Sequence, residues 1–142
     1  MVQLIMGLKG SGKTKRLVEM VATAVREESG SVVCIEKDKK LTYDIPYQAR
    51  LIYACDYAYA LGSYDFFKGF LSGLHAGNYD ITHLFVDGTF KIGKVGDVEK
   101  DYEGFAAMIQ KLAKVQSDAQ IIFTVSCDEA DLPVTVKDYI VK

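Results

Sequence analysis

The chain has few of the residues from which disulfide frameworks and zinc sites are built. It contains three cysteines and two histidines, and Cys34, Cys55 and Cys127 show no Cys-x-x-Cys spacing. Disulfide scaffolds and structural zinc sites both depend on closely spaced Cys and His residues. The sequence therefore argues against both, and we expect the thiols to be buried in a protein of the reducing cytoplasm.

Long apolar runs are also absent. No stretch approaches the ~20 apolar residues of a transmembrane helix. Val2–Met6 is too short for the apolar part of a secretory signal, and no small-residue cleavage site follows it. We therefore expect no membrane span and a cytoplasmic location.

An excess of one charge is missing as well, because the net charge is −2. The chain lacks the bulk positive charge that holds nucleic acid or an anionic membrane, which argues against both as partners. Its 142 residues, 49% apolar and 25% charged, suit a single domain spanning residues 1–142.

Apolar β-forming runs alternate with segments of helical period along the chain. The runs that predict strands are Val2–Met6, Val32–Glu36, Arg50–Cys55, Ile81–Val86 and Gln120–Ser126. Helices are expected at Thr14–Glu28, at Tyr64 to about His75 with Ser63 as the cap, and at about Glu99–Lys114. Strands separated by helices pair in parallel, so we expect a three-layer α/β domain with a mostly parallel five-stranded sheet.

Two segments are harder to assign. Leu41–Ile45 suggests a short extra strand that Pro46 ends. After Asp131, Pro133 suits the first turn of a helix, whereas the Val and Ile residues that follow favour a strand. A short helix is the preferred interpretation.

Between the first strand and the first helix lies a glycine-rich loop that ends in a lysine and a hydroxyl residue, Gly7-Leu8-Lys9-Gly10-Ser11-Gly12-Lys13-Thr14. Its glycines permit backbone angles that turn successive N–H groups toward a phosphate, and the helix that follows adds its positive dipole end. Lys13 can reach the β- and γ-phosphates, and the Thr14 hydroxyl can ligate Mg²⁺. The residues expected to bind a nucleotide are Gly7, Gly10, Ser11, Gly12, Lys13 and Thr14.

This loop resembles the Walker A motif of the P-loop NTPases, and the resemblance implies their fold. It also implies a Walker B element, which is an apolar strand that ends in Asp. Leu84-Phe85-Val86-Asp87 fits this element, so Asp87 is expected to hold Mg²⁺ through water together with Thr14. An Asp at a strand end is also common in ordinary turns.

Over most of its length the chain also resembles a group of short bacterial ATP-binding proteins, some of which are labelled as twitching-motility ATPases. The stretches that carry the likeness are GLKGSGKT, VVCIEK, LTYDI and AGNYD. The chain is too short for the additional domain of the twitching-motility family. His75 and His83 also form no paired-histidine motif.

The resemblance implies ATP rather than GTP, because the N/T-K-x-D sequence that reads guanine is absent. Many related ATPases place a glutamate after the Walker B Asp, and here that residue is Gly88. Asp56, Asp128 and Glu129 follow other strands and are the candidate catalytic residues. Each is equally consistent with a solvated turn.

Thr124 and Ser126 lie near the end of the fifth strand, where related ATPases often keep a polar residue that senses the γ-phosphate. Core packing explains Thr124 equally well.

Positively charged residues near the site are few. Arg16, Arg26 and Arg50 are the only arginines, and none lies where a transition-state arginine is expected. Because such arginines contribute about 10³–10⁵-fold to rate, we expect slow hydrolysis by the isolated chain. Lys91 and Lys94 could supply charge or bind a protein partner, or could simply be solvated.

Tyrosines and phenylalanines are concentrated between residues 53 and 70, more densely than one core helix requires. They predict core packing, with a base pocket or a docking surface as the alternative.

The leading hypothesis is an ATP-binding P-loop protein, a Mg²⁺-dependent ATPase with weak activity in isolation. Asp87-Gly88 with Phe90-Lys91 is faintly similar to nucleotide kinases, so a small nucleotide or metabolite kinase is one alternative. The other is a non-catalytic binding module in which residues 88–98, expected to form a loop rich in Gly and Lys, or the tyrosine-rich segment change shape with the bound nucleotide.

Overall fold

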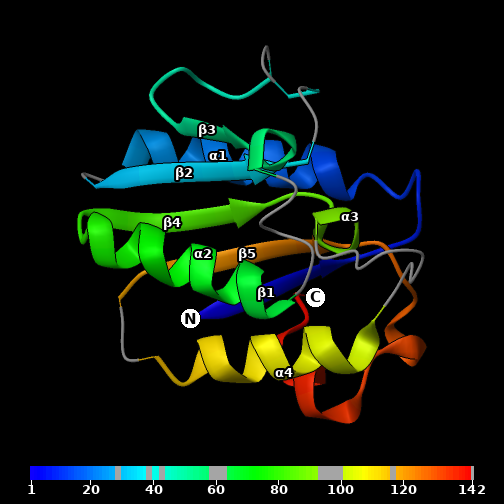
Figure 1. The fold of residues 1–142 in the computed structure, drawn as a ribbon. Coiled ribbons are helices and arrows are strands. Elements are labelled where there is room, and N and C mark those ends of the chain that lie inside the picture. Colours follow the sequence, from blue (N-terminus) through cyan, green and yellow to red (C-terminus); the bar gives the residue numbers. More distant parts are fainter. Residues whose placement is uncertain are drawn as a thin grey trace.

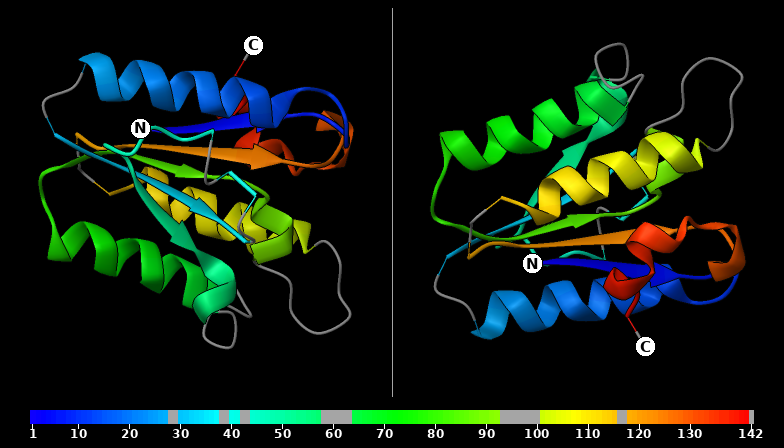
Figure 2. Two further views of the ribbon diagram at one scale, coloured as in Figure 1. Left: turned by 90° about the horizontal axis from the view of Figure 1, so that it is seen from above. Right: turned by 90° about the horizontal axis from the view of Figure 1, so that it is seen from below.

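The structure is a computed structural model, which describes residues 1–27, 30–37, 40–41, 44–57, 64–92, 101–115 and 118–141. One sheet forms its centre, with helices on both faces (Figures 1 and 2). The protein is therefore of the α/β class predicted from the alternating pattern. In this part of the chain no helix has both the length and the apolar character of a bilayer span.

The sheet contains five strands, and every pairing between them is parallel. Its order is β1-β5-β4-β2-β3. The strands are β1 (Val2–Met6), β2 (Ser31–Glu36), β3 (Arg50–Tyr53), β4 (Ile81–Val86) and β5 (Gln120–Val125). Since β5 and β4 lie between β1 and β2, the helix that joins β1 to β2 must cross both of them.

Helix α1 (Lys13–Glu27) makes this crossing on one face of the sheet. Its buried residues Leu17, Val21 and Ala24 recur every three or four positions and form one apolar stripe. The stripe packs on side chains from four strands, namely Ile5, Val32, Cys34, Phe85 and Ile122. The first helix was therefore predicted correctly, with its start one residue earlier.

Helices α2 (Tyr64–Gly77) and α4 (Tyr102–Ala113) cover the opposite face (Figure 2). Their core is aromatic: the Phe105 ring lies 6.0 Å from that of Tyr64, 5.3 Å from that of Phe90 and 6.3 Å from that of Phe123, all edge to face. Asp101 caps α4, because its carboxylate accepts a hydrogen bond of 2.9 Å from the Gly104 N–H.

Several boundaries differ from the sequence expectations. Strand β3 ends at Tyr53, and Ala54–Tyr57 form the 3-10 helix η1. The extra strand at 41–45 is wrong for its described residues, because the N–H groups of Asp44 and Ile45 donate to the Leu41 carbonyl and close a turn. Ser63, Glu99 and Lys100 lie outside the described residues.

Short helical segments occupy two places where the sequence predicted a loop or a single helix. Helix α3 (Thr89–Ile92) occupies the start of the segment predicted as a loop. The chain end forms the 3-10 helices η2 (Glu129–Asp131) and η3 (Val134–Tyr139), so the helical interpretation of the tail is confirmed in 3-10 form. Ile140 then forms a parallel bridge with Leu4, which explains why the tail also has a strand-like sequence.

The aromatic core generates the first prediction. Phe105 is fully buried at the centre of the cluster, so Phe105→Ala should lower the free energy of unfolding by about 3–5 kcal/mol. Phe66→Ala on α2 is the matched control, because Phe66 is 64% exposed and should cost less than about 1 kcal/mol. Urea unfolding of the two variants measures both values. Equal losses would contradict this description of the core.

Candidate functional site

The candidate site lies at one edge of the sheet, where all the strands end. Because the strands are parallel, the loop after β1, the α3 segment after β4 and the exit from β5 lie at the same edge (right in Figure 1). The loop after β1 leads to α1 on one face, and those after β4 and β5 lead to helices on the other. In open α/β sheets, ligands bind where loops diverge in this way.

The glycine-rich loop that joins β1 to α1 depends on glycine at more than one position. Gly10 and Gly12 both have φ of +86°, a conformation that costs other residues about 1–2 kcal/mol. A Cβ at Gly7 would overlap the Ser11 side chain. The Gly7 N–H donates to the Val125 carbonyl at 3.3 Å, which ties the start of the loop to the end of β5.

Lys13 and the loop backbone meet at one carbonyl. The Lys13 ammonium donates to the Leu8 oxygen at 3.4 Å, and the Ser11 N–H donates to the same oxygen at 3.1 Å. The lysine side chain therefore lies across the loop. Helix α1 begins at Lys13, so its unpaired N–H groups and positive dipole end are at the same place.

Thr14, Asp87 and Thr124 come together from three elements. The Thr14 hydroxyl of α1 donates to Asp87 Oδ1 at 3.2 Å, and the Thr124 hydroxyl of β5 donates to the same oxygen at 2.8 Å. Thr124 is fully buried and Asp87 is half-buried. Two residues 73 positions apart, each expected at a magnesium site, are thus in direct contact.

The alternation of side chains along the strands explains this meeting. Phe85 on β4 and Ile122 on β5 pack against α1. Asp87 and Thr124 stand two residues further along, and successive side chains of a strand alternate between faces. Both therefore point to the face on which α1 begins with Lys13 and Thr14.

Gly88 directly follows Asp87, at the position where the expected Walker B element often has a glutamate. Its φ is +71°, and its N–H donates to the Thr124 hydroxyl at 2.9 Å. A glutamate at this position would be strained by the left-handed backbone. The Thr124 hydroxyl therefore donates to Asp87 and accepts from Gly88, which uses its one donor and one of its acceptor positions.

Thr89 is a residue that the sequence interpretation did not single out. Its side chain is fully buried, and its hydroxyl donates to the Thr124 carbonyl at 2.8 Å. The next residue, Phe90, packs its ring 5.5 Å from that of Tyr102 on α4. Thr89 lay within an expected loop, and a lone Thr in a loop carries no signal of such a contact.

The three candidate catalytic carboxylates differ in position. Asp56 follows β3, two strands from β4, which corresponds to a separation of about 10 Å along the sheet. Asp128 and Glu129 follow β5, between β1 and β4. The Asp128 carboxylate accepts from the Ala130 N–H at 3.3 Å and so caps η2. All three are exposed, and the strand order brings Glu129 nearer to the loop than Asp56.

Glu36 at the end of β2 is a further carboxylate at this edge. It is 3% exposed, and it accepts hydrogen bonds from the N–H groups of Lys40 at 2.6 Å and Leu41 at 3.1 Å. These bonds tie the backbone at Lys40 and Leu41 to the end of β2. Glu36 therefore has a structural role that its position at the strand end does not reveal.

Two of the three arginines lie away from the loop. Arg26 lies in the last turn of α1, where its guanidinium donates to the Thr23 hydroxyl at 3.5 Å. Arg50 begins β3, away from the carboxyl edge of the sheet, as the sequence predicted, and it is exposed. Arg16 and Lys91 are exposed on α1 and α3. Lys94 lies outside the described residues.

The aromatic segment serves mainly the core in its described part. Tyr64 and Phe67 lie on the buried side of α2, whereas Phe66 is 64% exposed. The side chains of Tyr57 and Tyr59 lie outside the described residues. The packing interpretation is thus confirmed for the two buried rings.

The oxygen donors of Thr14 and Asp87 fit a magnesium ion. In nucleotide sites Mg²⁺ keeps several waters and is held by one or two protein oxygens together with phosphate oxygens. A hydroxyl and a carboxylate in contact at the end of the glycine-rich loop supply such oxygens. Among the described residues there is no group of three or more His, Cys, Asp or Glu side chains that could hold a metal by themselves.

No family model matches the chain, and no curated protein sequence matches it.

Cys34 of β2 provides a pH-dependent property of this region. Burial raises the pKa of its thiol from 9.0 to about 12, and the negative charges of Asp87 and Glu36 add to the effect. The folded protein therefore holds this proton at pH values at which the unfolded chain has lost it. Stability from this group is complete below pH 9.0 and is lost progressively between pH 9.0 and about 12.

We predict that the free energy of unfolding falls between pH 8 and pH 10 by about 1.4 kcal/mol more in the wild type than in Cys34→Ala. Val33→Ala on the same strand is the control, because it leaves a similar void and keeps the thiol. Urea unfolding at the two pH values measures the difference. An unchanged pH dependence in Cys34→Ala would contradict the assignment.

Proposed function

We propose that the chain is a P-loop protein that binds ATP with Mg²⁺ and, as an isolated chain, hydrolyses it slowly. The observation that carries the proposal is the 3.2 Å contact between Thr14 at the end of the glycine-rich loop and Asp87 at the end of β4. The Thr14 hydroxyl and the Asp87 carboxylate are far apart in the sequence, and their contact is not expected by chance. A magnesium site between phosphates and protein requires that they meet.

The loop would bind the phosphates through its backbone. Its glycines have the positive φ values that let neighbouring N–H groups face one anion, and the start of α1 adds its dipole. Lys13 already lies across the loop on the Leu8 carbonyl. It would exchange this weak hydrogen bond for charge-assisted bonds to phosphate, which are about twice as strong.

Asp87 and Thr14 would hold the magnesium ion, directly or through its waters, and the ion would neutralise phosphate charge. Thr124 would act on Asp87 rather than on the ion. Its hydroxyl donates to Oδ1 and accepts from Gly88, so the carboxylate is fixed in rotation before any ligand arrives. Such orientation of a ligand by a neighbouring hydrogen bond raises metal affinity.

Slow hydrolysis is expected from the residues around Thr14 and Asp87. The position after Asp87 is a left-handed glycine, and Arg26 and Arg50 lie away from the loop. Of the exposed carboxylates, Glu129 is the candidate for orienting the water, since Asp128 caps η2. A second protein that supplies an arginine would raise the rate, as it does in related enzymes.

The kinase alternative is less well supported than the ATPase. Its faint signature depends on Phe90, which is 5% exposed and packs against Tyr102 and Phe105. A buried core ring is not available to contact a phosphate acceptor. The binding-module alternative differs from the ATPase only in turnover, so a rate measurement separates the two.

The binding prediction is a thermal shift. With Mg²⁺ and ATP at about 100 times its dissociation constant, the unfolding free energy should rise by about 2.7 kcal/mol. For a domain of this size the melting temperature then rises by about 5–10 °C. Lys13→Ala should lose the shift, because it removes the charge that faces the phosphates.

Lys15→Ala is the matched control, since Lys15 is exposed on the same turn of α1 and should keep the full shift. ADP and GTP complete the comparison. If no nucleotide raises the melting temperature of the wild type, the isolated chain has no phosphate site and the proposal fails.

The turnover prediction concerns rate. Released phosphate should accumulate over several turnovers with kcat below about 10⁻² s⁻¹, the range of related enzymes that lack an external arginine. Asp87→Asn should require more Mg²⁺ for half-maximal turnover, because it removes the charge that holds the ion. Binding without any turnover would support the binding module, and turnover that needs an added acceptor would support the kinase.

A further inference from the structure

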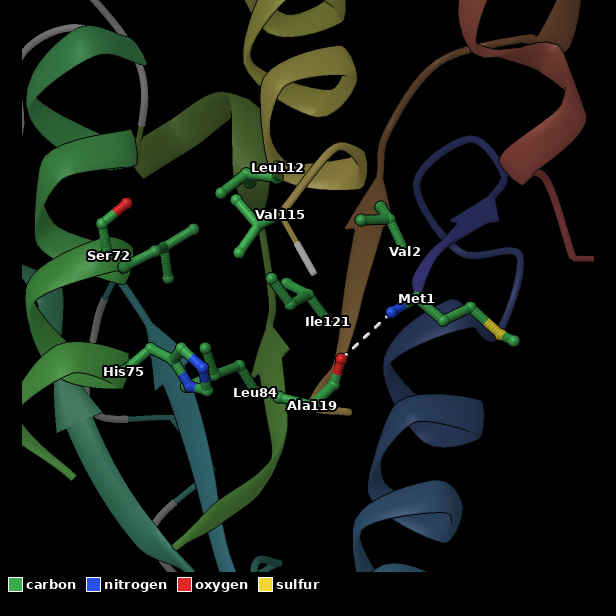
Figure 3. A pocket seen from close by; sticks show the side chains of 10 residues that line it. Met1, Val2, Ser72, His75, Leu84, Leu112, Val115, Ala119 and Ile121 are labelled. Carbon is green, nitrogen blue, oxygen red and sulfur yellow. Dashed lines mark hydrogen bonds between the residues drawn. The ribbon is translucent and has the colours of Figure 1, made fainter. Parts of the chain in front are cut away.

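An apolar cavity lies at the opposite edge of the sheet, where the strands begin. Side chains from α2, α4, β4 and β5 converge on it (Figure 3). Its wall is formed mainly by Leu71, Leu84, Leu112, Val115 and Ile121. Its volume is about 180 Å³. A dry apolar cavity of about 150 Å³ accepts a benzene molecule, so this one can take one ring or one branched alkyl group.

A second, polar hollow of about 850 Å³ adjoins this cavity. His75 at the end of α2 and Ala119 before β5 line both, so the two spaces are neighbours. The polar hollow is lined by Tyr79, which is 88% exposed, and by Asp80 and Asp118. An apolar recess therefore opens beside a surface that carries two carboxylates.

The two carboxylates belong to adjacent strands. Asp80 stands just before β4 and Asp118 just before β5, and β4 pairs with β5. Within the described part of the chain neither carboxylate makes a hydrogen bond or an ion pair, and no lysine or arginine lines the polar hollow. Two negative charges beside an apolar wall concentrate a negative potential that attracts cations.

The ammonium of Met1 is the opposing charge in this region. It lines the apolar cavity rather than the polar hollow, and it donates to the Ala119 carbonyl at 3.1 Å (Figure 3). Counted together, this ammonium and the two carboxylates carry one net negative charge. A net negative charge remains on the side of Asp80 and Asp118.

We propose that this edge binds a small organic cation, in which a ring-sized apolar group fills the cavity and an ammonium or guanidinium group faces Asp80 and Asp118. The cavity excludes larger apolar groups, and the carboxylates select against anions. This site lies at the edge of the sheet opposite to the glycine-rich loop, so it is separate from the proposed nucleotide site and does not depend on it.

The test uses three probes of one shape at low ionic strength and without nucleotide: 2-phenylethylamine, 2-phenylethanol and 3-phenylpropionate. Methyl NMR spectra should show shifts at Leu71, Leu84, Leu112 and Val115 with a dissociation constant on the order of millimolar. The amine should bind about threefold to tenfold more tightly than the alcohol, as expected for exposed ion pairs. The carboxylate should bind least tightly.

Two variants, each with a control, separate the contribution of the cavity to binding from that of the two carboxylates. Ser72→Phe should abolish binding by filling the cavity, because Ser72 lines it and donates only to the Lys68 carbonyl of its own helix. Ala76→Phe, exposed on the same helix and away from the cavity, should leave binding unchanged. An Asp80→Asn, Asp118→Asn double variant should remove the preference for the amine, whereas Asp65→Asn on α2 should not.

Melting temperatures within a few degrees of the wild type establish that each variant is folded. The proposal is overturned if the cavity methyl groups do not shift, if Ser72→Phe binds as well as Ala76→Phe, or if the three probes bind equally. It is also overturned if the double variant still prefers the amine.

Discussion

Parallel pairing of all five strands is the constraint on which the rest of the structure depends. Parallel neighbours must be joined by crossovers, and here helices cover both faces of the sheet, so the interior strands are apolar. Parallel pairing also brings the carboxyl ends of all five strands to one edge of the sheet. The glycine-rich loop, Asp87 and Thr124 can meet there only because β1, β4 and β5 run in the same direction.

The polar groups at this edge are held by one another rather than by the surrounding core. Thr124 is the centre of the arrangement: its hydroxyl joins Asp87 and Gly88, and its carbonyl accepts from Thr89. A buried hydroxyl without partners would cost about 1–3 kcal/mol, and here each bond also fixes a neighbour. The end of β4, the start of α3 and the end of β5 are therefore joined by hydrogen bonds, and the Gly7 N–H ties the glycine-rich loop to Val125 at the end of β5.

The two edges of the sheet differ in chemical character. At the carboxyl edge, the N–H groups of the loop, Lys13 and the start of α1 lie beside the Asp87 carboxylate. At the amino edge, an apolar cavity adjoins Asp80 and Asp118. Leu84 and Ile121 line this cavity, and they lie on the same strands that carry Asp87 and Thr124 to the other edge. A ligand at either edge would therefore contact strands that reach the other.

Much of the fold was predictable because its elements carry their own periodicity. The five strands lie where apolar runs indicated, and the Leu17, Val21 and Ala24 stripe defined α1. The boundaries that were wrong are those decided by local hydrogen bonds, such as the turn at Leu41 and the 3-10 turn after Tyr53. Periodicity does not register such bonds, because they involve only a few residues.

The sequence by itself determined the class of fold, the position of the glycine-rich loop and the identification of Asp87 as a candidate magnesium ligand. Each of these depends on residues that are close together in the chain. Only the tertiary structure decided that β5 lies between β1 and β4, and hence that Thr124 contacts Asp87. It alone revealed the buried Thr89, the left-handed Gly88 and the cavity at the far edge. The physical reason is that strand order arises from pairing between distant segments, on which no local pattern reports.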